Sequence, residues 1–150
     1  MVVKALADND SLMEILNRAT LMLAAGDMMR AREDVQAGLA LDARHAPLLC
    51  TLGLIEMAEA RPNEAQQALL AARVSDPALL EAHVNLSVLL FEIGNIEGAI
   101  EALDLAVKHH PGADLLYFNR GFAKQCLGRW EEAASDFSKA LELGSENVEA

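Results

Sequence analysis

Few residues in this chain have types and spacing that suit metal binding. His109 and His110 are neighbours and stand directly before Pro111. Adjacent side chains point about 100° apart around a helix, so these two imidazoles do not form a joint metal site. We expect them at the carboxyl end of a helix, where the helix dipole favours a positive charge. His83 is predicted to be a buried packing residue.

The two cysteines, Cys50 and Cys126, show no metal or redox spacing. They suggest a reduced compartment, and we predict a cytoplasmic location. No basic residue stands near Cys50 to activate its thiol, so both cysteines are interpreted as small apolar contacts.

Catalytic motifs are also missing from the sequence. It has no Ser/His/Asp or Cys/His arrangement, no glycine-rich phosphate loop and no HExxH motif. The carboxylates of Glu131, Glu132 and Asp136 are predicted to lie on outer helical faces, where water solvates them. We therefore predict that the chain is not an enzyme and has no cofactor or metal.

The composition favours closely packed helices. Of the 150 residues 53% are apolar but only 4% are aromatic, and no stretch alternates with the period of a strand. The formal net charge of −11 argues against nucleic acid and anionic membranes as partners. No apolar run reaches the roughly 18 residues of a membrane span.

The chain repeats itself in four units of equal length, 12–45, 46–79, 80–113 and 114–147. Small residues recur at three positions of the unit, which predicts two helices that cross at short distance. They are Ala19, Gly53, Ser87 and Gly121 at the eighth position, Ala31, Ala65, Ala99 and Ala133 at the twentieth, and Gly38, Ala72, Ala106 and Ala140 at the twenty-seventh.

The turn between the two helices of each unit is predicted at the fifteenth position. Gly26, Gly94 and Gly128 stand there and can end a helix in the left-handed conformation. Ala60 departs from this pattern, and we expect Pro62 to begin the second helix of that unit.

The fourth unit shows which family the repeat resembles. Asn119–Gly121, Leu127–Ala133 and Lys139–Leu143, with Pro77 and Pro111 at the repeat junctions, are similar to the tetratricopeptide repeat (TPR) family. The resemblance covers residues 12–147. It implies an all-α fold, a right-handed α-solenoid of four antiparallel helix–turn–helix repeats, which we expect to form a single domain over residues 1–150.

Both ends of the chain lie outside the four units. Ser11-Leu12-Met13-Glu14 has the form of a capping box, which predicts that the first helix begins there and that residues 1–11 are an N-terminal arm. Residues 148–150 resemble the start of a capping helix that is truncated or missing. We interpret this end as that of a shortened chain or, as an alternative, as a surface covered by self-association.

The resemblance also predicts a binding groove, because repeat positions two, five, nine, twelve and thirteen generally face a concave surface in the family. Positions five, nine and twelve are mainly apolar here, which predicts a stripe with almost no charge. They are Leu16, Thr20, Leu23, Cys50, Leu54, Met57, Val84, Val88, Phe91, Phe118, Phe122 and Gln125. Asn17, Asn85 and Asn119 recur at position six and could hydrogen-bond the backbone of a bound peptide.

Several family members grip the terminal carboxylate of a peptide with lysine, arginine and asparagine, but positions two, five and nine have no basic residue here. We expect instead a module or scaffold that binds an apolar or amphipathic protein segment. One alternative is a small chaperone of a secretion system that shields a hydrophobic client. Another is the interaction or regulatory domain of a larger enzyme such as a glycosyltransferase. Self-association through the groove or the C-terminal end also stays open.

Overall fold

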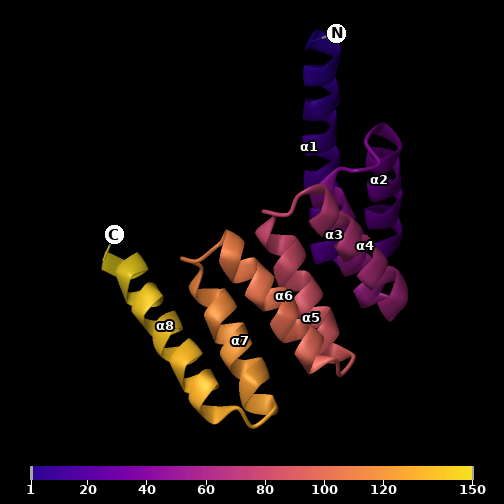
Figure 1. The fold of residues 1–150 in the computed structure, drawn as a ribbon. Coiled ribbons are helices and arrows are strands. Elements are labelled where there is room, and N and C mark those ends of the chain that lie inside the picture. Colours follow the sequence, from indigo (N-terminus) through magenta and orange to yellow (C-terminus); the bar gives the residue numbers. More distant parts are fainter. Residues whose placement is uncertain (1, 150) are drawn as a thin grey trace. The chain divides into compact units, whose positions relative to one another are not determined.

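The fold is entirely helical in the part of the chain that the structure describes. This computed structural model describes the backbone of residues 2–149 and the side chains of residues 11–146 (Figure 1). The helices are α1 (Val2–Ala24), α2 (Met28–Leu41), α3 (Ala46–Ala58), α4 (Pro62–Ser75), α5 (Leu80–Glu92), α6 (Ile96–His109), α7 (Asp114–Cys126) and α8 (Trp130–Glu149). The all-α prediction is confirmed. None of these helices is long and apolar enough to cross a membrane.

Helix starts follow the repeat period of the sequence. The second helices of the four hairpins begin at Met28, Pro62, Ile96 and Trp130, which stand at the same position of each sequence unit. Polar side chains help to fix these starts: the Asp27 carboxylate accepts a hydrogen bond from the backbone N–H of Arg30 at 3.1 Å. Repeated sequence positions therefore become repeated helix boundaries.

The turn residues take the left-handed conformation in all four hairpins. Gly26, Gly94 and Gly128 have φ angles of 79°, 85° and 73°. Ala60, which has a Cβ, is held at a φ of 58°, where an L-residue is strained. The predicted start of the following helix at Pro62 is confirmed.

Two predictions about the ends of the chain are wrong. Helix α1 begins at Val2 and runs through Ser11 without interruption, because residues 2–10 contain no glycine or proline to stop it. Helix α8 continues to Glu149, so no new helix starts at Val148. Pro111 follows the end of α6 by two residues, whereas Ser145 occupies the equivalent place and does not break α8.

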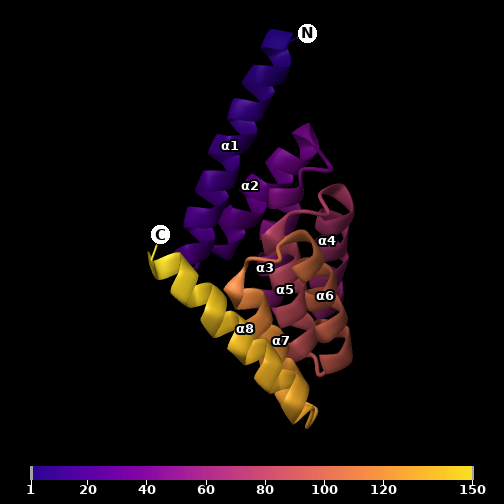
Figure 2. The ribbon, with the colours of Figure 1, turned by 60° about the vertical axis from the view of Figure 1, so that its left-hand side comes forward.

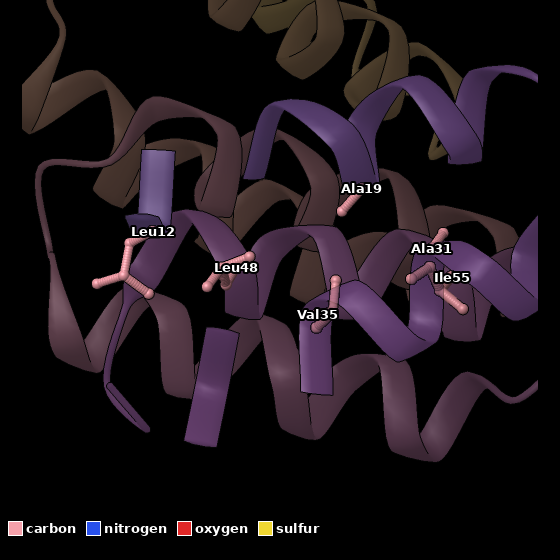
Figure 3. Close-up of a cluster of buried hydrophobic side chains, with 6 residues drawn as sticks. All are labelled: Leu12, Ala19, Ala31, Val35, Leu48 and Ile55. Carbon is pink, nitrogen blue, oxygen red and sulfur yellow. The ribbon is translucent and has the colours of Figure 1, made fainter. Parts of the chain in front are cut away.

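The contacts of the chain divide it into two compact units, one ending at Ala82 and the other beginning at His83. In the first unit α1 packs on α2 and α3, and α3 packs on α4. Helix α1 extends beyond the end of α2 (Figures 1 and 2). The buried side chains at its centre come from α1, α2 and α3 (Figure 3), and they are Leu12, Ala19, Ala31, Val35, Leu48 and Ile55.

Small residues allow the helices of a hairpin to approach closely, as the repeat predicts. All twelve small residues at the eighth, twentieth and twenty-seventh positions are buried. A Cβ added to Gly53 would lie only 2.6 Å from Cγ of Leu69, which is itself fully buried. The α3–α4 crossing thus depends on the missing side chain at Gly53.

In the second unit α7 packs against both α6 and α8. The Tyr117 hydroxyl donates a hydrogen bond of 2.9 Å to the carbonyl of Pro111 and so fastens α7 to the first half of the α6–α7 loop. His83 is fully buried, as predicted, and its ring stacks on that of His109 at 5.7 Å between centroids.

Candidate functional site

The predicted groove residues of the first unit are mostly half-buried. Leu16 and Leu23 pack against the buried cluster of Figure 3. Leu54 and Met57 are also half-buried, while Thr20 is exposed and its hydroxyl donates to the carbonyl of Leu16 at 2.8 Å. These side chains offer limited apolar surface to a partner.

Cys50 does not belong to an accessible groove, because only 5% of it is exposed. Its burial, with a smaller effect of the Glu81 and Asp76 charges, raises the pKa of its thiol to about 12. The interpretation of Cys50 as a small apolar packing group fits this environment. Cys126 is exposed.

In the second unit the structure brings four predicted residues together around one cavity of about 340 Å³. We call this the groove cavity. Val88 and Phe91 of α5 meet Phe122 and Asn119 of α7 there, with the Phe91 and Phe122 ring centroids 5.4 Å apart. Val88 and Phe122 are 38% and 47% exposed, so their apolar surface is open to a ligand.

Sequence reasoning missed the other residues of the groove cavity. Its inner wall is made of small and apolar side chains from α6 and α7, namely Ala99, Leu103 and Ala123. Ser87 and Glu92 of α5 add polar atoms. Glu92 stands at repeat position thirteen, one of the positions that face the groove in the family, so the same rule could have found it.

The remaining predicted residues lie elsewhere in their units. Phe118 lines a second concavity of about 1020 Å³, where its ring lies 5.6 Å from that of Phe137. We call this the α7–α8 hollow; its lining includes Leu115, Ala140 and Leu141. Val84 and Asn85 are half-buried, and Asn17 and Gln125 are exposed; none of the four lines either concavity.

A buried ion-pair cluster joins α7 to α8. The Arg120 guanidinium donates two hydrogen bonds to the Asp136 carboxylate, at 2.9 and 2.7 Å, and a third to Asp104 at 2.9 Å. The Lys124 ammonium lies 3.0 Å from the same Asp136 carboxylate. The prediction that Asp136 is solvated on an outer face is wrong, because only 4% of the residue is exposed. Glu131 and Glu132 are exposed as predicted.

The charge of Asp136 is held in place by its partners. Burial alone would raise the pKa of this carboxyl, but hydrogen bonds from Arg120 and Lys124 and their positive charges outweigh it. The pKa of Asp136 is therefore lowered from its ordinary value of 3.8. A carboxylate fixed in this way is shared between two cations, with Asp104 as a second counter-ion of Arg120, and is not available as an acid or base.

The first and fourth repeats share this pair, whereas the middle repeats do not. Arg18 and Asp34 stand at the same repeat positions as Arg120 and Asp136 and form a 2.6 Å ion pair. The second repeat has Leu52 and Ala68 there, and the third has Leu86 and Ala102. The spacing of sixteen residues between arginine and aspartate was a readable signal for both pairs.

A separate charged cluster in the first unit was also missed by sequence reasoning. The guanidinium of Arg32 on α2 reaches both Glu56 and Glu59, each at 2.5 Å, and Arg61 lies 3.6 Å from Glu56. Glu56 is only 5% exposed, so these arginines compensate a buried charge. Among the described residues no group of three or more His, Cys, Asp or Glu side chains is placed to hold a metal ion.

The chain is a helical-repeat protein, because its helical hairpins recur at a constant period. Each hairpin has a left-handed turn residue and small residues where its helices cross. Two family models, each described as tetratricopeptide repeat, match residues 50–114 and 115–147. The chain therefore belongs to the tetratricopeptide repeat family. A comparison with curated protein sequences gave no match.

Solved structures with the same fold include two crystal structures of MamA. One is 25% identical in sequence, with a TM-score of 0.83 over 99% of this chain and 86% of that chain. The other is also 25% identical, with a TM-score of 0.79 over 99% of this chain and 80% of that chain. A tetratricopeptide repeat protein from Parabacteroides merdae, 22% identical, has a TM-score of 0.77 over 91% of this chain and 54% of its own.

Proposed function

We propose that this chain is a non-enzymatic interaction scaffold that binds an apolar or amphipathic segment of a protein partner, with the groove cavity as the main contact. The repeat fold supports a role in protein interaction. The proposal rests on the groove cavity, because apolar side chains of α5 and α7 are exposed to solvent there, within the second unit.

The exposed ring of Phe122 gives a partner a specific anchor. It is 47% exposed, and it contacts the ring of Phe91 so that both form one apolar wall. Covering such a side chain removes apolar area from water, and full burial of a phenylalanine is worth about 1.5–3 kcal/mol. Small residues in the inner wall, Ala99 and Ala123, leave space for an inserted side chain.

A display library of short random peptides tests the proposal. Selection on the wild-type chain should enrich peptides, and Phe122→Glu should abolish their binding because it places a charge in the apolar wall. Trp130→Glu is the matched control, since Trp130 is an exposed aromatic residue of α8 that does not line the groove cavity. Circular dichroism of both variants establishes that they keep their helices.

The proposal fails if no peptide is enriched on the folded wild-type chain. It also fails if the enriched peptides bind folded Phe122→Glu as tightly as wild type. Loss of binding in Trp130→Glu but not in Phe122→Glu would show that the peptides bind near Trp130 and not in the groove cavity.

Self-association through the α7–α8 hollow is a second candidate. Leu141 is 76% exposed, and with Leu115 and Phe118 it forms an apolar surface around the hollow. If a second copy covers this surface, the fraction of assembled chains should rise with protein concentration. Sedimentation velocity should show it, and Leu141→Glu should return the chain to a monomer; a wild-type chain that is monomeric at high concentration contradicts this candidate.

A further inference from the structure

The polar side chains that line the groove cavity differ in whether they already make a hydrogen bond or ion pair within the chain. The Ser87 hydroxyl already donates to the carbonyl of Val84 at 2.7 Å. Within the described part of the chain, the Asn119 amide makes no side-chain hydrogen bond and the exposed Glu92 carboxylate makes no ion pair. The cavity therefore combines an apolar wall with one carboxylate and one amide that can bind a ligand.

Three cations of α7 and of the turn after it are bound to other carboxylates, so they do not neutralise Glu92. Arg120 and Lys124 of α7 both pair with Asp136, and their side chains are only 16% and 12% exposed. Arg129 pairs with Glu97 on α6. Residues 83–150 contain eleven Asp and Glu residues but only five Lys and Arg residues. Among the residues that line the cavity only Glu92 is charged, and the segment around it has a net negative charge.

Resting on the proposed function, we infer that the partner segment is basic as well as apolar. Its apolar side chain enters the groove cavity against Val88, Phe91 and Phe122. A lysine or arginine next to that side chain pairs with Glu92, and the Asn119 amide hydrogen-bonds the backbone of the segment. The ligand class is a cationic amphipathic protein segment.

Charge complementarity selects this ligand class over three others. An acidic segment would meet the Glu92 carboxylate and the net charge of −11 with repulsion. A second copy that docked groove to groove would bring a second Glu92 carboxylate to the first, so self-association through the groove is disfavoured. A neutral apolar segment would fill the cavity but would gain nothing from Glu92.

The peptides selected from the random display library are the probe. We expect Lys or Arg to be enriched within a few positions of Leu, Met or Phe in them. Glu92→Gln should weaken binding of the selected peptides by about two- to fivefold, which is the range for an exposed ion pair. The matched control is Glu101→Gln, which removes the same charge from an exposed carboxylate of α6 that does not line the cavity; its effect should stay below about twofold.

Failure of this inference differs from failure of the proposed function. If Phe122→Glu abolishes binding but the selected peptides lack basic residues, or Glu92→Gln and Glu101→Gln have equal effects, the groove stands and the cationic ligand is wrong. If peptides are enriched but Phe122→Glu has no effect, or none is enriched, the proposed function itself is wrong.

Discussion

Single residues of this chain hold unusual conformations and charges, and Ala60 is the clearest conformational case. Its φ of 58° lies in the region where the three equivalent turn residues are glycine. Ala60→Gly should raise the free energy of unfolding by about 0.5–1 kcal/mol, because relief of a strain of roughly 1–2 kcal/mol exceeds the entropy that glycine adds to the unfolded chain. Urea denaturation measures the change.

Gly94→Ala is the reverse experiment at an equivalent turn. No atom lies within 4 Å of the added Cβ, so only the backbone conformation is affected. A loss of about 1 kcal/mol is expected. Equal stabilities of Ala60→Gly and wild type would show that the turn of the second repeat relaxes around its alanine.

Asp136 is the residue on which the α7–α8 ion-pair cluster depends. Asp136→Asn should lower the free energy of unfolding by about 3–5 kcal/mol, because it leaves Arg120 and Lys124 poorly compensated in a buried site. Urea denaturation at neutral pH measures the loss, with Glu131→Gln as the exposed control. A loss below about 1 kcal/mol would mean that water solvates the two cations.

The pH dependence of stability provides an independent check on Asp136. Its pKa is lowered in the folded chain, so the unfolded chain binds the proton more readily. The stabilisation is complete well above the ordinary pKa of 3.8 and is lost as the pH falls below that value. The difference between wild type and Asp136→Asn should therefore shrink in acid, and a difference that is independent of pH would contradict the ion pair.

The two cysteines should react very differently with a thiol reagent. Cys126 is exposed, whereas Cys50 is buried with a pKa raised to about 12, so almost none of its thiol is ionised near neutral pH. Iodoacetamide labelling followed by mass spectrometry should modify Cys126 alone until urea is added. Equal labelling of both in the native chain would show that α3 opens readily.

At the scale of helices, close crossings limit which side chains a hairpin accepts. Gly53→Ala should destabilise the chain by roughly 1–3 kcal/mol, since its Cβ would overlap the buried side chain of Leu69. Gly112→Ala is the control, because nothing lies within 4 Å of its Cβ. Thermal unfolding measures both, and an unchanged transition in Gly53→Ala would mean that α3 and α4 can separate slightly at no cost.

Most of the helical architecture could be predicted from the sequence, because small residues and turn glycines act locally and recur. The ends could not. The Ser11 capping box is a local signal, and it has no effect where nothing interrupts the preceding helix. The burial of Asp136 was missed because a surface carboxylate and a paired buried one look the same in a single helix; only its spacing from Arg120 distinguishes them.

The groove could be predicted only in part. The repeat positions identified Val88, Phe91 and Phe122, but whether they enclose a cavity depends on Ala99, Leu103 and Ala123 from two helices. Cys50 follows the same positional rule and is nevertheless buried, because neighbouring side chains rather than its own position decide its exposure.

On the scale of the whole molecule, acidity should govern partner binding. The net charge of −11 and the Glu92 carboxylate of the groove cavity predict that affinity for a cationic peptide falls as salt is added, since ions screen exposed charges beyond about 10 Å at 0.1 M. Fluorescence anisotropy titrations at low and high salt measure the effect. Binding that is unchanged or stronger in high salt would mean that apolar contact alone holds the peptide.

The placement of charged pairs in the first and fourth repeats and of apolar pairs in the two between them also bears on how the chain reaches its native pairing. Proteins built of repeated hairpins can misfold, because a helix can pair with the wrong neighbour of similar sequence. If α7 took α6 as its hairpin partner, Arg120 would face Ala102 in place of Asp136; if α8 joined α5, the Asp136 carboxylate would face Leu86. Each mistake would bury a charge without its counter-ion. The ion pair thus helps the chain to reject a hairpin that joins α7 or α8 to a helix of the two middle repeats.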